Sequence, residues 1–151
     1  MAAAEGSTVH ASCVLTGPRA VLIRGPAGSG KSRLAHSLVE AGRTGRLPFA
    51  RLVADDRVRL IPTHGRLLAK VPEPLRGQIE IRGLGIRRLE YESCACVGLV
   101  VDLAAADAGR LPEAAALETD ILGVTLSRLP IASGEQALAV VVAALLHVTE
   151  A

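Results

Sequence analysis

A glycine-rich octapeptide between an apolar run and a segment of helical spacing constrains the fold of this chain more than any other feature. The octapeptide is Gly25-Pro26-Ala27-Gly28-Ser29-Gly30-Lys31-Ser32. It fits the pattern G-x-x-x-x-G-K-[ST], in which backbone N–H groups surround a phosphate at a helix N-terminus. The sequence therefore predicts a strand, a phosphate-binding loop and a helix, in that order.

The segments beside the octapeptide have the patterns that such a loop needs. Residues 8–15 and 20–24 read as two short strands around a Gly-Pro turn. After Lys31, Leu34 and Leu38 recur at helical spacing, and Gly42 is expected to stop the helix. The alternative, a chance match in a glycine-rich turn, does not account for this strand and helix.

The rest of the chain is predicted to be rich in strands. The candidate strands are residues 49–54, 58–61, 67–71, 78–82, 96–103 and 124–129. Residues 134–147 are predicted to form a C-terminal helix, whereas residues 104–117 fit either a surface helix or a loop. We expect one α/β domain over residues 1–151, with a β-rich sheet flanked by helices.

Composition excludes several classes of protein. No apolar run reaches the roughly 18 to 20 residues needed to span a bilayer, and no basic segment followed by an apolar one opens the chain. We therefore expect a cytoplasmic, soluble protein that does not enter membranes. A net charge of only +2, with Phe49 and Tyr91 as the sole aromatics, argues against nucleic-acid binding by base stacking.

The cysteines do not have the spacing of a metal site. Cys94 and Cys96 are separated by one residue, which is too close for the usual zinc or redox motifs, and Cys13 stands alone. We expect all three to be small core residues. The four histidines are also dispersed, and structural or solvated roles suit them better than metal binding.

A phosphate-binding loop of this kind works with a carboxylate at the end of a neighbouring strand. Lys31 would contact the β and γ phosphates and the Ser32 hydroxyl would bind Mg²⁺. Asp55 and Asp56 follow an apolar strand and are candidates for the metal site and for the general base. Asp102 is a rival for the metal role, and a solvated strand end is the plain alternative in each case.

A second unusual stretch combines charge with glycine. Glu80 and Arg82 would share one side of a strand, and the glycines at positions 83 and 85 would let the backbone approach a ligand. An ion pair on an edge strand explains the same two residues equally well.

Three segments taken together resemble the catalytic domain of the HPr kinase/phosphorylase family. They are residues 25–32, Leu52-Val53-Ala54-Asp55-Asp56, and Ile79-Glu80-Ile81-Arg82-Gly83-Leu84-Gly85-Ile86. The resemblance implies a fold similar to that of phosphoenolpyruvate carboxykinases. It also implies ATP- and Mg²⁺-dependent phosphorylation of a serine in HPr, a small phosphocarrier protein, and the reverse reaction with inorganic phosphate.

The resemblance also implies roles for individual residues. The nucleotide-binding candidates are Gly25, Pro26, Ala27, Gly28, Ser29, Gly30, Lys31, Ser32 and the following Arg33. Magnesium would lie near Ser32, Asp55 and Glu80. Asp56 would act as acid or base, and Arg82 would support the acidic site or the moving phosphoryl charge. Lys31 and Asp55 complete the catalytic candidates.

Two departures from the family pattern leave parts of this reading open. The chain has no counterpart of the N-terminal domain of longer members, and Ser133-Gly134-Glu135 stands where they have Pro-Gly-Arg. Phosphorylase activity, HPr docking and homo-oligomer formation therefore stay open. A nucleotide-sensing module without transfer is the non-enzymatic alternative. A small-metabolite kinase is another, although no Arg-rich lid segment supports it.

Overall fold

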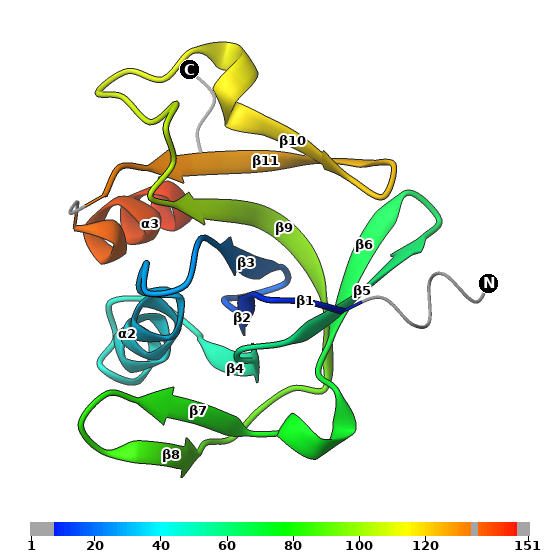
Figure 1. Cartoon of the computed structure of the whole chain (residues 1–151), viewed down its shortest axis with the longest axis vertical. Coiled ribbons are helices and arrows are strands. Elements are labelled where there is room, and N and C mark those ends of the chain that lie inside the picture. Colours follow the sequence, from blue (N-terminus) through cyan, green and yellow to red (C-terminus); the bar gives the residue numbers. More distant parts are fainter. Residues whose placement is uncertain (1–7, 134–135, 148–151) are drawn as a thin grey trace.

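A computed structural model of the chain describes residues 8–133 and 136–147 (Figure 1). Its strands are β1 (Thr8–Val9), β2 (Ser12–Leu15), β3 (Ala20–Arg24), β4 (Arg51–Ala54), β5 (Val58–Thr63), β6 (Arg66–Lys70), β7 (Gln78–Ile81), β8 (Gly85–Arg88), β9 (Cys94–Leu103), β10 (Glu118–Ile121) and β11 (Val124–Ile131). The helices are α2 (Lys31–Arg43) and α3 (Ala137–Leu146). Short 3-10 turns occupy Glu73–Leu75 and Ala114–Leu117.

Strand β9 organises a curled, nine-stranded sheet. The path runs β1-β5-β6-β9-β3-β2-β4, and β11 joins β9 and carries β10. The start of β9 pairs antiparallel with β6, whereas its later residues pair in parallel with β3 and with β11. β7 and β8 form a separate two-stranded hairpin near α2. The three parallel strands β3, β9 and β11 therefore end at one edge of the sheet.

Each face of the sheet has its own apolar core because alternate residues of a strand point to opposite faces. On β3, Val21 and Ile23 pack on the face that α2 and α3 cover. Leu22 packs on the other face, inside the curl of the sheet. On β9, Val100 and Val101 divide in the same way, so the predicted central strand is covered on both faces.

The expected mixed α/β architecture is confirmed, with corrections of detail. Both helices pack on the same face of the sheet, so the second core forms without residues of either helix. The sequence patterns missed β8 and β10, and residues 104–117 form a loop that ends in a 3-10 turn. The predicted helix over 134–147 begins at Ala137, and residues 134 and 135 lie outside the described residues. No described helix is long and apolar enough to cross a bilayer.

Two residue-level expectations were wrong. α2 does not stop at Gly42 but continues to Arg43. Glycine is needed there for space, because a Cβ on Gly42 would lie 2.6 Å from the Cβ of Ala50. Cys94 is exposed rather than a core residue, although Cys13 is fully buried.

Candidate functional site

The octapeptide forms a tight loop between β3 and α2, as its pattern predicts. Gly28 and Gly30 have φ values of 80° and 99°, in a backbone region that residues other than glycine rarely occupy. The loop closes back on its start, because a Cβ on Gly25 would lie 2.5 Å from Ser29 Oγ. Ser29 Oγ is itself buried and has no hydrogen-bond partner within the described part of the chain. The loop therefore carries an unsatisfied polar group.

The first turn of α2 is positively charged, which is unusual for a helix. It contains no acidic residue, and Lys31 and Arg33 lie beside N–H groups that already bear partial positive charge. The Lys31 ammonium donates to the carbonyls of Gly25 and Pro26 at 2.8 and 3.2 Å. The repulsion between these positive charges is unfavourable without a bound anion, but it suits this helix end to binding a phosphate.

Asp55 is the carboxylate that lies against the loop. Only 5% of its surface is exposed. The hydroxyls of Ser32 and Ser12 each donate to its Oδ1 at 2.7 Å. The backbone N–H of Glu80 donates to its Oδ2 at 3.3 Å. Two candidate magnesium ligands, Ser32 and Asp55, are thus in direct contact.

Asp56 points away from its neighbour and is exposed. Its φ is 75°, a conformation that costs energy for any residue with a side chain and is often found at functional sites. Its carboxylate lies 3.6 Å from His10 Nδ1, and the other His10 nitrogen is 3.2 Å from the Arg57 guanidinium. The two adjacent aspartates therefore face different surroundings, one buried beside the loop and one open to solvent.

The hairpin residues Glu80 and Arg82 differ from expectation. β7 ends at Ile81, so Arg82 belongs to the turn and does not share a strand face with Glu80. Both side chains are exposed, and no ion pair joins them within the described residues. Glu80 reaches the site through its backbone N–H rather than through its carboxylate.

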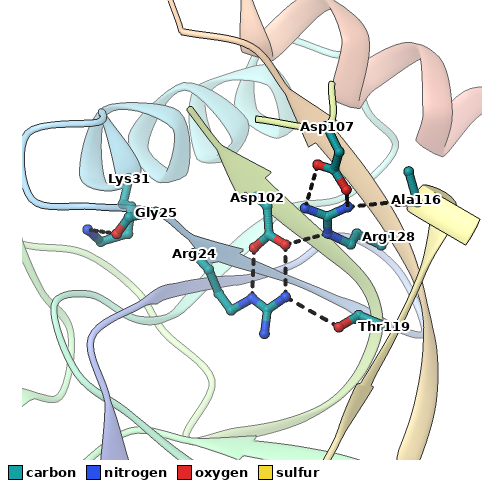
Figure 2. A network of polar contacts seen from close by, with 8 residues as sticks. All are labelled: Arg24, Gly25, Lys31, Asp102, Asp107, Ala116, Thr119 and Arg128. Carbon is teal, nitrogen blue, oxygen red and sulfur yellow. Dashed lines mark hydrogen bonds and ion pairs between the residues drawn. The ribbon is translucent and has the colours of Figure 1, made fainter. Parts of the chain in front are cut away.

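Asp102 does not fit its expected role as a rival metal ligand. The guanidinium of Arg24 binds both of its oxygens, at 2.7 and 2.8 Å, and Arg128 Nε also donates to it (Figure 2). Burial raises the pKa of Asp102, but the hydrogen bonds and positive charges of the two arginines outweigh this and hold the pKa below its ordinary 3.8. This carboxylate is ionised and fully paired.

Three contacts at the site were missed from the sequence. Ser12 supports Asp55, His10 lies beside Asp56, and Arg128 reaches Asp102 from another strand. The polar Ser12 inside an apolar strand was a usable signal, because a buried hydroxyl needs a partner. Gly134 and Glu135, where the family pattern has Gly-Arg, lie outside the described residues.

Comparison with known proteins places the chain in a family. The model of the HPr Serine kinase C-terminal domain matches residues 2–150. The chain belongs to the HPr serine kinase C-terminal domain family. An HPr kinase/phosphorylase from an Exiguobacterium species is 34% identical over 119 residues, which are 74% of this chain and 36% of that protein. This HPr serine kinase C-terminal domain therefore spans about a third of that relative's length.

Other relatives agree with this assignment. An HPr kinase/phosphorylase of Brevibacillus brevis is 45% identical over 67 residues, covering 44% of this chain and 19% of that protein. The solved structure of the Hpr(Ser) kinase/phosphatase from Coxiella burnetii superimposes with a TM-score of 0.73 at 23% identity. That match covers 92% of this chain and 93% of the solved chain, and it shows that the two share a fold.

Proposed function

We propose that residues 1–151 act as one kinase domain that transfers a phosphoryl group from ATP to a serine of HPr or an HPr-like phosphocarrier protein. The contact between Ser32 and Asp55 carries the proposal. It joins the end of the phosphate-binding loop to a buried carboxylate directly after β4, the strand that follows the helix. Family membership supports the choice of acceptor.

The loop has the groups that a triphosphate requires. Backbone N–H groups at the start of α2, the Lys31 ammonium and the Arg33 guanidinium provide positive charge for it. Lys31 now donates to loop carbonyls and would exchange them for phosphate oxygens. The buried, unpaired Ser29 hydroxyl is one more donor within the loop.

The residues around Asp55 fit a magnesium ion. Among the residues that the structure describes, no group of three or more His, Cys, Asp or Glu side chains forms a metal cage. Mg²⁺ at phosphate sites needs no such cage, because it binds through one or two carboxylates with water and phosphate. Ser32 and Asp55 would hold the ion, with Glu80 beside them, and the bound ion would neutralise phosphate charge. Ser12 and the Glu80 N–H keep the Asp55 carboxylate oriented.

Asp56 is suited to accept the proton of the acceptor serine. It is exposed, so a protein substrate can reach it, and it follows Asp55 directly in the chain. His10, 3.6 Å away, is suited to orient the carboxylate. The same carboxyl group, once protonated, would return the proton in the reverse reaction, so one residue serves both directions. Arg82, in the exposed turn, would support the moving phosphoryl charge only after the hairpin meets the substrate.

The Asp56→Asn variant tests the proposal. We expect it to bind ATP as the wild type does, because Asp56 makes no described contact with the loop, and to lose at least about 100-fold in transfer rate, the range for a lost general base. Titration with ATP measures the binding, and transfer from labelled ATP to purified HPr, followed by mapping of the labelled residue, measures the rate. Full transfer by this variant would refute the general-base role. A wild-type protein that binds ATP tightly but labels no HPr would favour the nucleotide-sensing module.

A further inference from the structure

The Arg24, Asp102 and Arg128 side chains form an ion-pair network at the edge of the sheet where the nucleotide loop begins (Figure 2). Arg24 is the last residue of β3 and directly precedes Gly25. Asp102 is its register partner on the parallel neighbour β9. Leu22, Val100 and Leu126 mark the face inside the curl, and alternation puts the three charged residues on that same face. The network therefore lies opposite α2.

The network is nearly closed within itself. Arg24 makes a bidentate pair with Asp102, the geometry that fixes a guanidinium most firmly. Arg128 donates to Asp102 and also to both oxygens of Asp107, at 2.8 and 3.1 Å, and to the carbonyl of Ala116 at 2.9 Å. Only 14% of the Arg128 side chain and 15% of that of Asp102 are exposed. Two acids balance two arginines, so the network carries no net charge.

The network continues into the loop through the backbone. Arg24 directly precedes Gly25 in the chain, and the Gly25 carbonyl accepts a hydrogen bond from the Lys31 ammonium at 2.8 Å. A Cβ on Gly25 would lie 3.1 Å from the Cβ of Leu103, the residue after Asp102. The end of β9 therefore holds the first loop residue in two ways, by the ion pair to Arg24 and by the packing of Leu103 on Gly25.

We propose that Asp102 and Arg128 are positioning residues for the nucleotide loop: they hold Arg24, and through it Gly25 and Lys31, in the geometry that binds phosphate. Asp107 and Ala116 extend the same hold to the segment between β9 and β10. The effect on nucleotide binding rests on the proposed function, whereas the effect on the conformation of the loop does not.

Hydrogen exchange on the nucleotide-free protein tests the loop directly. We expect Asp102→Asn to speed exchange of the amides of residues 25–32 by about tenfold, because local opening becomes easier. The later turns of α2 should be unchanged. Arg128→Lys, which keeps the charge but loses the planar fork, should give a smaller increase.

Arg51→Gln is the matched control. Arg51 pairs with Glu92 at 3.1 Å and with Glu90 at 3.6 Å, at the end of β4 away from Asp55. Its loss should lower the melting temperature without changing exchange in residues 25–32. Unchanged loop exchange in Asp102→Asn, or an equal increase in Arg51→Gln, would overturn the positioning role.

Titration of ATP with Mg²⁺ separates the two proposals. The dissociation constant should rise about tenfold in Asp102→Asn and stay constant in Arg51→Gln. A wild type that binds no ATP would refute the nucleotide site, and the exchange result would still decide the loop. An ATP affinity that Asp102→Asn leaves unchanged would refute the positioning role alone.

Discussion

At the scale of single residues, the adjacent pair Asp55 and Asp56 shows how position divides two identical side chains. Asp55 lies directly after β4, is buried, and accepts hydrogen bonds from the hydroxyls of Ser12 and Ser32. Asp56 takes a positive φ and turns its carboxylate to solvent beside His10. The buried carboxylate is suited to a metal and the exposed one to a substrate proton.

This division predicts that the same substitution affects magnesium-dependent ATP binding at one position and not at the other. In Asp55→Asn, the gain in ATP affinity that Mg²⁺ provides should be lost, because the carboxylate charge next to Ser32 is gone. In Asp56→Asn, the matched control, that gain should persist. Calorimetric titrations of ATP with and without Mg²⁺ measure it. An equal loss in both variants would show that the two aspartates share the metal.

At the scale of elements, α2 carries the site and is packed very closely at its far end. Its apolar face buries Leu34 and Leu38 against the sheet. At Gly42 the helix approaches the segment before β4 so closely that a Cβ would meet the Ala50 Cβ at 2.6 Å and its backbone nitrogen at 2.7 Å. This contact links the helix of the phosphate loop to the strand that directly precedes Asp55.

Gly42→Ala should therefore destabilise the protein, although alanine is normally favoured over glycine inside a helix. The helix preference of about 0.5–1 kcal/mol is smaller than the roughly 1–3 kcal/mol that such overpacking costs. We expect a melting temperature lower by about 2–8 °C. Gly109→Ala, in a loop with nothing within 4 Å of the added Cβ, is the control and should cause no loss. A stabilised Gly42→Ala would show that the contact relaxes freely.

At the scale of the whole molecule, local features were predictable and contacts between distant strands were not. The loop and the start of α2 follow from neighbouring residues, so the octapeptide was enough to predict them. The Arg24–Asp102 pair spans 78 positions and depends on the pairing of β3 with β9. The contacts of Asp55 with Ser12 and with the Glu80 N–H likewise span 43 and 25 positions. One sequence carries no signal for strand order at that range.

The Asp102 network also gives the whole fold a dependence on pH. The arginines hold the folded-state pKa of Asp102 below the ordinary 3.8, so the network stabilises the fold above that pH and loses its effect as pH falls through the lower value. The difference in unfolding free energy between wild type and Asp102→Asn, about 2 kcal/mol near neutral pH, should shrink below about pH 4. Urea unfolding between pH 3 and 7 measures it. A difference that grows in acid would contradict this sign.

The most direct test of the proposed function is the identity of the labelled product when the protein meets labelled ATP, Mg²⁺ and HPr. We predict phosphoserine on HPr, formed only with Mg²⁺ and absent with Lys31→Ala, whose loop lacks the ammonium that contacts Gly25. Lys70→Ala, an exposed lysine on β6, should label HPr as the wild type does. HPr that stays unlabelled with the wild type, or labelling that survives Lys31→Ala, would contradict the account.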